Sequence, residues 1–281
     1  MNLESYPINS LSGEITCPGD KSISHRSIIL GSISNGITSV SGFLEGEDSL
    51  ATLNAFKSMG VKIERNGSNV VIHGVGMKGL EEPKNPLYLG NSGTSIRLMS
   101  GLLSAQKFNS KLCGDESLST RPMGRVIKPL QEMGADISGD DSKPPLLIKG
   151  GKQLSGIEYT LPVASAQIKS CILLAGLYSE GKTTVIENGI SRDHTERMLK
   201  GFGYDVTSSN NRISLLGGGS FKGCDIEVPS DISSAAFFMV AGCISENSSL
   251  LLNSVNINPT RTGVIDILRL MGGNIELLNQ K

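Results

Sequence analysis

Apolar residues recur at helical spacing in four segments of the chain, and a glycine follows each segment. Two examples are the segments 123–133 and 264–271, in which apolar side chains return every three or four positions. This spacing is typical of an amphipathic helix, and glycine is favoured just beyond a helix end. The residues after each glycine alternate as in a half-buried strand. The central glycines are Gly60, Gly134, Gly203 and Gly272.

These four glycines mark an internal repeat, because they are separated by 74, 69 and 69 residues. Upstream of each lies a second recurring block, which has a polar start, an apolar helix rich in small residues, a turn and a strand. We predict the four apolar helices at 28–33, 96–103, 168–177 and 235–244. The unit of about 70 residues is therefore an α/β unit of the form βαβαββ, and a fixed period of this kind indicates a repeated fold.

Each unit is predicted to close with a β-hairpin. In the first unit, strands at 61–64 and 69–73 flank the turn Asn66-Gly67, a strong hairpin signal. In the third, strands at 205–207 and 212–216 flank Asn210-Asn211. The fourth unit has a strand-like run at 274–278 and no returning strand, so we expect the last domain of this chain to be incomplete.

Composition and charge narrow the class of protein. The 281 residues are 38% hydrophobic, with 26 basic and 27 acidic side chains, so a sizeable core is expected and a nucleic-acid or membrane surface is not. The first ten residues lack a secretory signal pattern, and no apolar run has the length of a membrane span. The five cysteines are widely spaced; we interpret them as reduced residues of a cytoplasmic protein.

The stretch 18–27 combines a turn, a helix start and two cations, Lys21 and Arg26. Pro-Gly ends the preceding segment, and Asp20 or a neighbouring serine is a candidate N-cap. Free backbone N–H groups and the helix dipole would attract an anion there. The alternative is an ordinary capped surface helix with solvated cations.

The starts of the other apolar helices are polar in the same way. If the repeats pack around a common axis, these helix starts can converge on one polyanionic ligand. Arginine is suited to bidentate recognition of phosphate or carboxylate, although a single arginine is more often part of a surface salt bridge. We expect Arg121 to precede a helix that begins at Pro122. The polar residues concerned are Asn91, Ser92, Gly93, Thr94, Arg97, Ser165 and Gln167.

The three histidines give weaker signals. His73 lies in an alternating strand and is expected to be packed or at the surface, His25 is expected to form a local hydrogen bond, and His194 fits a helix cap. A Ser/His/Asp triad, a nucleotide-binding glycine loop or a metal cluster cannot be assembled with suitable spacing. What remains is chemistry that depends on positioning and charge.

Five motifs together resemble the 5-enolpyruvylshikimate-3-phosphate synthase family. They are Pro-Gly-Asp-Lys-Ser-Ile-Ser-His-Arg at 18–26, Leu-Gly-Asn-Ser-Gly-Thr-Ser-Ile-Arg at 89–97, Arg-Pro-Met-Gly-Arg-Val at 121–126, Ala-Ser-Ala-Gln-Ile-Lys at 164–169 and Ser-Arg-Asp-His-Thr-Glu at 191–196. The likeness extends over nearly the whole chain. The motifs at 121–126 and 191–196 are similar to those of the bacterial branch that includes glyphosate-tolerant enzymes.

The resemblance implies an inverse α/β barrel, in which two domains of three βαβαββ units close on the substrates. Residues 20–228 would form one complete domain, and 1–19 with 229–281 an incomplete second domain. The implied enzyme is a 3-phosphoshikimate 1-carboxyvinyltransferase of the shikimate pathway, which leads to chorismate and aromatic amino acids. It transfers the enolpyruvyl group of phosphoenolpyruvate to the 5-hydroxyl of shikimate 3-phosphate and releases phosphate.

The resemblance also implies the residues that bind the two substrates. Lys21 would contact both and is the implied catalytic residue. Ser22, Arg26, Ser165, Ala166 and Gln167 would bind shikimate 3-phosphate. Gly93 and Arg121 would bind phosphoenolpyruvate, with Asn91, Thr94, Lys169 and Arg192 at the same site. The implied protein is a cytoplasmic monomer that requires no metal, cofactor, nucleic acid or membrane.

Two departures from the family qualify this interpretation. The family's acidic general base and further cations would lie beyond Lys281, so we expect little or no turnover from this chain alone. Glyphosate-tolerant relatives often have alanine where this chain has Gly93, so we expect greater sensitivity to glyphosate. Two alternatives are a non-catalytic fragment that binds shikimate 3-phosphate, and a UDP-N-acetylglucosamine enolpyruvyl transferase, whose characteristic cysteine is absent from 116–120.

Overall fold

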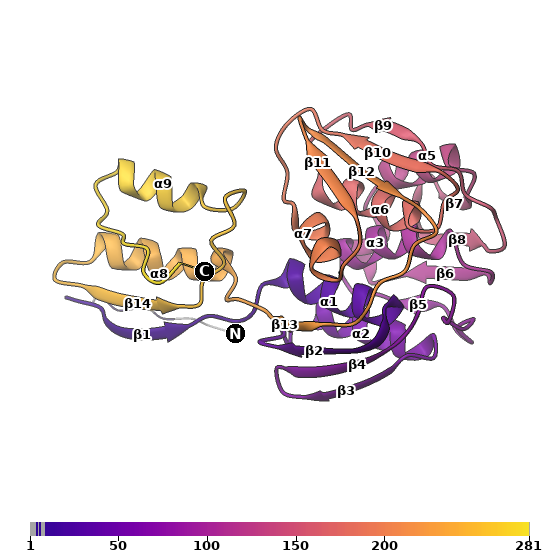
Figure 1. Cartoon of the computed structure of the whole chain (residues 1–281). Coiled ribbons are helices and arrows are strands. Elements are labelled where there is room, and N and C mark those ends of the chain that lie inside the picture. The colour runs from indigo at the N-terminus through magenta and orange to yellow at the C-terminus, as the bar shows by residue number, and fades with distance from the viewer. Residues whose placement is uncertain (1–3, 5, 7–8, 281) are drawn as a thin grey trace. The chain divides into compact units, whose positions relative to one another are not determined.

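The computed structural model describes residue 4, residue 6 and residues 9–280. Most of the N-terminal segment inspected for a signal, and Lys281, lie outside these residues. The chain divides into two compact units (Figure 1). The larger unit spans 21–227, and the smaller combines the described residues of 1–20 with those of 228–281. These bounds differ by one residue from the domain limits of 20–228 expected from the sequence.

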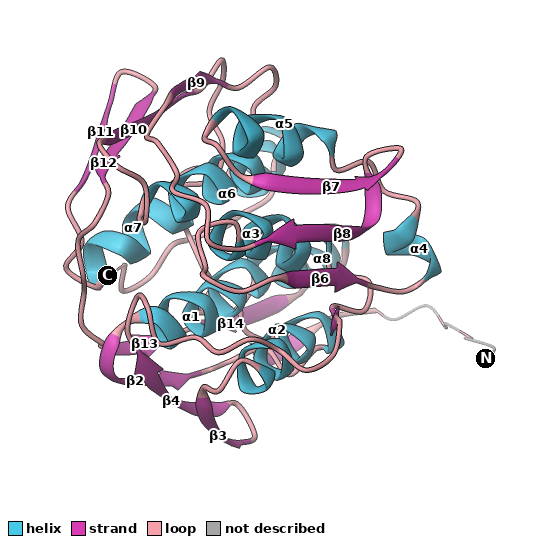
Figure 2. Cartoon of the chain, turned by 90° about the vertical axis from the view of Figure 1, so that its right-hand side faces the viewer, coloured by secondary structure: helices cyan, strands magenta, loops and turns pink. Residues whose placement is uncertain are grey.

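The larger unit, all of whose residues are described, consists of three four-stranded sheets and seven helices. The three sheets surround a central group of helices (Figure 2). Its elements are α1 (Lys21–Ile33), β2 (Asn35–Ser41), α2 (Glu47–Ser58), β3 (Lys62–Asn66), β4 (Asn69–Val75), β5 (Leu87–Tyr88), α3 (Gly93–Leu103), β6 (Ser110–Cys113), α4 (Glu116–Ser119), α5 (Gly124–Glu132), β7 (Asp136–Asp140), β8 (Lys143–Lys149), β9 (Glu158–Thr160), α6 (Ala166–Gly176), β10 (Lys182–Ile186), α7 (His194–Gly201), β11 (Val206–Ser209), β12 (Arg212–Leu216) and β13 (Asp225–Glu227).

The three sheets share one topology, as the repeat predicts. Their strand orders are β13-β2-β4-β3, β5-β6-β8-β7 and β9-β10-β12-β11. In each sheet the first two strands are parallel and the other pairs are antiparallel. Helices α1, α3 and α6 lie inside, and their residues are buried on nearly every face. This is the inverse arrangement of an α/β barrel, with the helices inside and the sheets outside.

The small residues of the inner helices allow close packing. A Cβ added at Gly101 of α3 would lie 2.0 Å from the backbone oxygen of Cys171 in α6, so only glycine fits there. Buried serines return their hydroxyl hydrogen to the preceding turn: Ser100 donates to the Ile96 carbonyl at 2.7 Å and Ser104 to the Ser100 carbonyl at 2.7 Å. These bonds allow the helix to bury these serines with their hydroxyls satisfied.

The predicted turn chemistry is confirmed. The four repeat glycines have positive φ angles of 87°, 98°, 84° and 93°, the left-handed conformation that ends a helix. The hairpin β3–β4 pairs Asn66 with Asn69, and β11–β12 pairs Ser209 with Arg212. Asn210 and Asn211 both have positive φ, as the favoured two-residue hairpin turn requires.

The smaller unit, as far as it is described, has a two-stranded parallel sheet with two helices. Its strand β1 (Ser12–Thr16) precedes α1 in the chain, yet it pairs with β14 (Ser249–Asn253). The corresponding position beside β2 is filled by β13 from the larger unit. The first strand of the smaller unit's sheet therefore comes from the N-terminal segment, and the first strand of the sheet that contains β2 comes from the end of the larger unit. The chain passes from one unit to the other after β1 and again after β13. The helices are α8 (Ile232–Ile244) and α9 (Gly263–Leu270).

Asp20, at the end of the smaller unit's first segment, is buried in a polar network. Its Oδ2 accepts hydrogen bonds from Asn256 Nδ2 at 3.0 Å and from Arg261 Nη1 at 3.1 Å. Arg261 also donates through Nη2 to Asp231 Oδ1 at 3.0 Å. The carboxylate therefore ties the residue before Lys21 to the α8–α9 side of the smaller unit.

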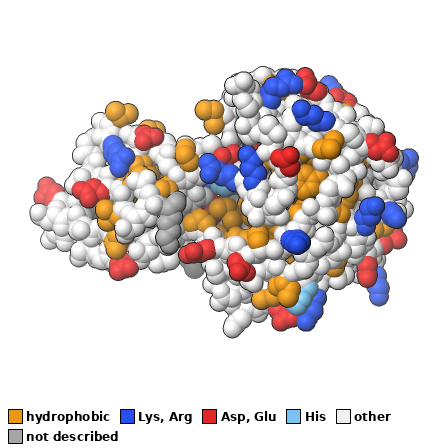
Figure 3. Space-filling model, in the orientation of Figure 1, with side chains coloured by type: hydrophobic (Ala, Val, Ile, Leu, Met, Phe, Trp, Pro, Cys, Tyr) orange, Lys and Arg blue, Asp and Glu red, His pale blue; other side chains and the backbone are white. Residues whose placement is uncertain are grey.

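Two expectations about elements differ from the structure. Residues 274–278 form no strand, since no described strand pairs with them and an unpaired strand lacks its ladder hydrogen bonds. Helix α5 begins at Gly124, with Met123 as its N-cap residue, rather than at Pro122 as expected. Helix α8 is as apolar as predicted, but Phe237 is 79% exposed. Hydrophobic side chains are visible on the surface of the smaller unit (Figure 3).

Candidate anion-binding site

The start of α1 brings Lys21 and Ser22 to the surface and directs Arg26 inward. The Lys21 side chain is 46% exposed and forms an ion pair with Asp48, in the first turn of α2. Arg26 is only 4% exposed. The two cations expected to face one anion therefore have different surroundings, with Lys21 within reach of solvent.

Arg26 joins three helices of the larger unit. Its Nε donates to Thr195 Oγ1 at 2.7 Å, its Nη2 to Ser170 Oγ at 2.7 Å and its Nη1 to the Ser22 carbonyl at 2.9 Å. The hydroxyls of Ser170 and Thr195 are themselves 2.7 Å apart. Arg26 thereby fixes the start of α1 against α6 and α7.

The start of α3 is held by a buried hydroxyl network. Ser92 Oγ accepts a hydrogen bond from the Ser95 backbone N–H at 3.1 Å, which caps the helix. Ser95 Oγ is 2.6 Å from Thr52 Oγ1, and Thr52 Oγ1 is 2.8 Å from His25 Nδ1. Burial, with the charges of Lys21 and Arg26 as smaller causes, lowers the His25 pKa to about 3. His25 is therefore neutral at pH 7. The expectation of a local hydrogen bond is wrong, because the partner of His25 is Thr52 on α2, 27 residues further along the chain.

Two arginines approach the bare α-carbon of Gly93. A Cβ placed there would be 2.8 Å from Arg97 Nη1 and 2.9 Å from Arg121 Nη1. Arg121 also donates to Asn91 Oδ1. Within the described part of the chain, neither arginine forms a salt bridge with a carboxylate. Two adjacent guanidinium groups without an acidic partner are suited to bind an anion.

The electrostatics of Arg97 agree with this geometry. Burial lowers the pKa of its guanidinium, and the nearby charges of Arg121 and Arg125 lower it further, while Cys171 raises it. The positive charges at this point therefore repel one another. An anion bound between Arg97 and Arg121 would remove that repulsion.

Gln167 connects the start of α6 to the start of α3. Its Oε1 accepts a hydrogen bond from Arg97 Nη1 at 2.7 Å, and its Nε2 donates to Thr94 Oγ1 at 2.9 Å. Ser165 caps α6 by accepting from the Ile168 backbone N–H at 3.4 Å. Two of the predicted helix starts are thus brought together, and Gln167 fixes the orientation of Arg97.

Lys169 is enclosed, although the resemblance implied a substrate-binding role. Its side chain is 1% exposed, and Nζ lies 2.9 Å from Glu187 Oε2 and 2.6 Å from Glu196 Oε1. Arg192, by contrast, is accessible to solvent, and its Nη1 lies 3.5 Å from Ser22 Oγ. Arg192 is therefore exposed beside the half-buried Ser22, whereas Lys169 is enclosed by two carboxylates.

The remaining predicted positions are described more briefly. Ala166 is 9% exposed and begins α6 directly after the cap. His73 is a surface residue whose Nε2 lies 3.2 Å from Glu64 Oε1. All five cysteines are described and free of disulfides. Among the described residues, no cluster of His, Cys, Asp or Glu is suited to hold a metal, and no helix is long and apolar enough to cross a membrane.

Sequence reasoning missed the acidic partners of the site. Asp48, Glu187 and Glu196 come from three different segments, and nothing in their local sequence predicts that they meet Lys21 or Lys169. The sequence grouped Arg97 with Lys21, Arg26 and Arg121 as candidate anion-binding cations, but it did not place Arg97 beside Arg121 in particular. Its pairing with Arg121 depends on the packing of α3 beside the α4–α5 connection.

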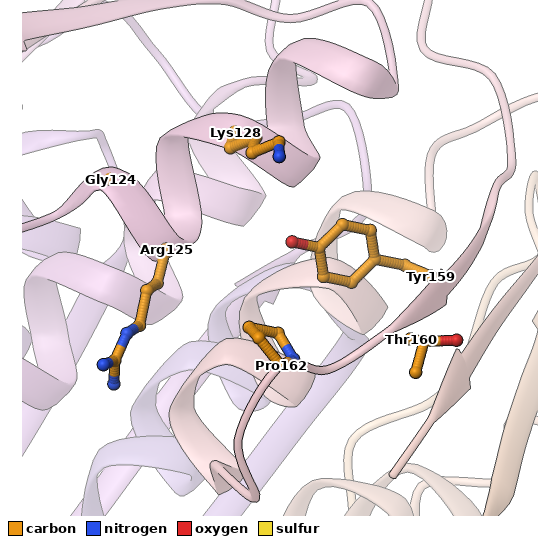
Figure 4. A pocket seen from close by; sticks show the side chains of 6 residues that line it. All are labelled: Gly124, Arg125, Lys128, Tyr159, Thr160 and Pro162. Atoms are coloured by element: carbon orange, nitrogen blue, oxygen red, sulfur yellow. The ribbon is translucent and has the colours of Figure 1, made fainter. Parts of the chain in front are cut away.

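A separate surface groove lies between α5 and the β9 region (Figure 4). Its volume is about 480 Å³, and none of the predicted substrate-binding residues lines it. Two cations from α5, Arg125 and Lys128, and the aromatic Tyr159 contribute to it. On the face of the larger unit seen in Figure 3, basic and acidic side chains are interspersed, unlike the single-sign field of a nucleic-acid surface.

Comparison with known proteins identifies the family. The family model described as EPSP synthase (3-phosphoshikimate 1-carboxyvinyltransferase) matches residues 5–281. A relative named 3-phosphoshikimate 1-carboxyvinyltransferase, from Ruthia magnifica subsp. Calyptogena magnifica, is 64% identical over 275 residues, which cover 98% of this chain and 63% of the relative. Another of that name from Legionella pneumophila (strain Lens) is 56% identical over 282 residues, covering 100% and 65%.

Solved structures agree with the sequence comparisons. EPSP synthase from Acinetobacter baumannii superposes with a TM-score of 0.92 at 59% sequence identity, covering 97% of this chain and 62% of that structure. The chain therefore spans a little under two thirds of the length of these relatives. These matches favour the first interpretation of the motifs over the UDP-N-acetylglucosamine enolpyruvyl transferase alternative. With its repeated βαβαββ sheets, its helix-start cations and these matches, the chain belongs to the EPSP synthase family.

Proposed function

We propose that the larger unit binds shikimate 3-phosphate and phosphoenolpyruvate, as one part of a 3-phosphoshikimate 1-carboxyvinyltransferase. The observation that carries this proposal is the approach of Arg97 and Arg121 to Gly93 at the start of α3. Both substrates carry several acidic groups, and paired guanidinium groups bind phosphate and carboxylate in a bidentate manner.

The two substrates are assigned to neighbouring helix starts. Phosphoenolpyruvate is proposed to lie over Gly93, with Arg121, Asn91 and Thr94 around it and Arg97 as a further contact. The bare α-carbon of Gly93 lets the ligand approach the backbone. Because Gln167 holds Arg97 at 2.7 Å, little side-chain entropy remains to be lost when the anion binds.

Shikimate 3-phosphate is proposed to lie between the starts of α1 and α6. Arg192 lies beside Ser22, so we assign it to shikimate 3-phosphate rather than to phosphoenolpyruvate, the ligand that the resemblance implied. Ser165, Ala166 and Gln167 lie at the α6 start. Arg26, which donates hydrogen bonds to three groups inside the protein, is better suited to fix Ser22 than to contact the ligand. Lys21 is exposed enough to contact both substrates.

The proposed reaction needs charge stabilisation above all. The 5-hydroxyl of shikimate 3-phosphate loses its proton as its oxygen adds to C2 of phosphoenolpyruvate, and C3 gains a proton. Phosphate then leaves the tetrahedral intermediate while C3 loses a proton, which restores the double bond. Lys21 and the arginines stabilise the phosphate groups and the charge that develops as the intermediate forms and collapses. Such preorganised cations require no metal or cofactor.

Binding is the property to measure on this chain. Calorimetric titration with shikimate 3-phosphate, and then with phosphoenolpyruvate in its presence, should give saturable binding in both steps, and Arg121→Met should weaken the phosphoenolpyruvate step. Arg65→Met is the matched control, because Arg65 lies on the hairpin of the first repeat, where it pairs with Glu45 and is not part of the proposed ligand site. Absence of saturable binding, or equal losses in both variants, would contradict the proposal.

Turnover is best tested in a chimera. Residues 1–281 can be joined to the remaining length of the Acinetobacter baumannii enzyme, to which this chain is 59% identical. We expect phosphate release from the chimera in the presence of both substrates and little or none from the 281-residue chain. A chain that binds shikimate 3-phosphate but yields an inactive chimera would favour the non-catalytic binding alternative.

We further propose that the enzyme acts as a monomer in the cytoplasm, without nucleic acid or a membrane. The net charge of -1 and the interspersed surface charges support the absence of a nucleic-acid partner. The five free cysteines support a reducing compartment. Light scattering coupled to size exclusion would test the oligomeric state.

A further inference from the structure

The larger unit contains a buried cluster of three charged side chains beneath the proposed substrate site. Lys169 in the first turn of α6 lies between Glu187, which follows β10, and Glu196 in the first turn of α7. Their side chains are 1%, 8% and 5% exposed. Three ionisable groups are therefore removed from water within one small region.

Such a cluster is a poor source of stability. Taking charges out of water costs several kcal/mol per ion, and a buried pair is often no better than apolar residues of similar size. Burial raises the pKa of the Glu196 carboxyl, against the opposite effect of Lys169. One Glu196 oxygen, Oε2, has no hydrogen-bond partner among the described residues. A role other than stability is thus needed to account for the cluster.

Glu187 connects the cluster to the substrate site. Its Oε2 is bound by Lys169, and its Oε1 accepts a hydrogen bond from the hydroxyl of Ser191. Ser191 immediately precedes Arg192, the arginine that lies beside Ser22. A continuous path of contacts therefore runs from Lys169 through Glu187 to the backbone that carries Arg192.

The other end of this path is the start of α6. Lys169 lies two residues after Gln167, which binds both Arg97 and Thr94. Lys169 thereby links the segment that fixes Arg97 to the loop that carries Arg192. These are the two places where the proposed function requires cations at a defined separation.

We propose that Lys169 and Glu187 are positioning residues, which hold the Arg192 loop against the start of α6 so that Arg192 meets the phosphate of shikimate 3-phosphate. This inference rests on the proposed function. It assigns Lys169 a role different from the direct substrate contact implied by the family resemblance, since its ammonium is enclosed by two carboxylates.

The direct variant is Lys169→Met, which should weaken shikimate 3-phosphate binding by about tenfold or more. It leaves two carboxylates buried without their cation, and so the protein can fail to fold. Ser191→Ala is the cleaner variant, because it removes only the hydroxyl between Glu187 and the loop. We expect it to fold normally and to raise the dissociation constant about fivefold, and we expect Ser191→Thr, which keeps the hydroxyl, to restore binding.

A double-mutant cycle with Arg192→Met identifies the route of the effect. If Ser191 acts through Arg192, then Ser191→Ala should change the dissociation constant less than about twofold once Arg192 is replaced, because coupled residues are not additive. The matched control is Ser58→Ala, which removes a serine hydroxyl that donates to the Ala55 carbonyl at 2.7 Å, far from Arg192 in the chain. It should leave binding unchanged.

The outcomes separate this inference from the proposed function. The positioning role alone would be overturned if Ser191→Ala lowered the affinity for shikimate 3-phosphate equally in the unmodified protein and in Arg192→Met. It would also be overturned if Ser191→Ala caused no loss of affinity in the otherwise unmodified protein. Failure of Ser191→Thr to restore binding would also count against it. Absence of shikimate 3-phosphate binding by the unmodified chain would overturn the proposed function and the inference together.

Discussion

The Nη1 atoms of Arg97 and Arg121 both approach the position that a Cβ would occupy on Gly93, at 2.8 and 2.9 Å. Like charges so close together are unfavourable without an anion. Their arrangement is maintained by Gln167, which binds Arg97, and by Asn91, which binds Arg121. The protein therefore holds repelling cations in the geometry that a multiply charged ligand needs.

Replacing one of these cations should weaken ligand binding without loss of stability. Arg121→Met removes a charge-assisted contact to the ligand, worth about 1.5–3 kcal/mol, so affinity for phosphoenolpyruvate should fall by roughly 10- to 100-fold. The melting temperature should stay the same or rise, because the repulsion from Arg97 is relieved. Calorimetry in the presence of shikimate 3-phosphate and a thermal melt of the free protein measure the two effects. A drop of several degrees in melting temperature would contradict this account.

A methyl group on Gly93 should be tolerated by the fold and alter the ligand site. In Gly93→Ala the new Cβ meets only the ends of two flexible arginine side chains, which can shift, and alanine favours the helix that begins there. We expect weaker inhibition by glyphosate in the chimera with the Acinetobacter baumannii enzyme, and a higher KM for phosphoenolpyruvate. Steady-state inhibition curves for the two versions provide the measurement, and no gain in resistance would refute the idea.

Local chemistry explains which features could be predicted from the sequence. The helix ends at Gly60 and Gly134, the polar start of α3 at 91–94 and the turn at Asn210-Asn211 all depend on a few neighbouring residues. The apolar pattern likewise located the inner helices. These signals are short range, so they survive without knowledge of the tertiary packing.

Features that depend on packing between distant segments could not be predicted. Lys169 resembles any helical lysine until Glu187 and Glu196 are brought to it. The apolar sequence of α8 resembles that of α6, although Phe237 is exposed in the structure and Ile172 is buried. The spacing of apolar residues predicts a helix and its apolar face. Whether that face is buried also depends on which other elements pack against it.

The buried guanidinium of Arg26 should matter for stability more than its charge alone suggests. Lysine cannot reach Thr195, Ser170 and the Ser22 carbonyl at the same time. We therefore expect Arg26→Lys to lower the free energy of unfolding by about 2–4 kcal/mol, the cost of buried polar groups that lose their partners. Urea unfolding provides the measurement.

The matched control for Arg26 is Arg65→Lys, at an arginine on the surface that pairs with Glu45. A surface pair contributes at most about 1 kcal/mol, so this change should have little effect on unfolding. If Arg26 instead contacts the ligand directly, Arg26→Lys would weaken shikimate 3-phosphate binding while leaving the unfolding curve nearly unchanged. The two measurements therefore distinguish a supporting role from a binding role.

The neutral, buried His25 should make stability depend on pH. Its pKa is about 3 in the folded protein, against an ordinary value of 6.5 that applies to the unfolded chain. Between these values the unfolded chain binds a proton that the folded protein does not, so stability falls as pH falls. The slope is about 1.4 kcal/mol per pH unit, or about 2 kcal/mol between pH 7.5 and pH 5.

The His25→Gln variant has no imidazole at this position to bind a proton, so its stability should lack this part of the pH dependence. The difference in unfolding free energy between the unmodified protein and the variant should therefore shrink by about 2 kcal/mol from pH 7.5 to pH 5. Urea unfolding followed by circular dichroism measures it at both pH values. His73→Gln is the control, because His73 is a surface residue beside Glu64. A His25→Gln difference that is the same at both pH values would show that His25 is protonated in the folded protein, despite its burial beside Thr52, Lys21 and Arg26.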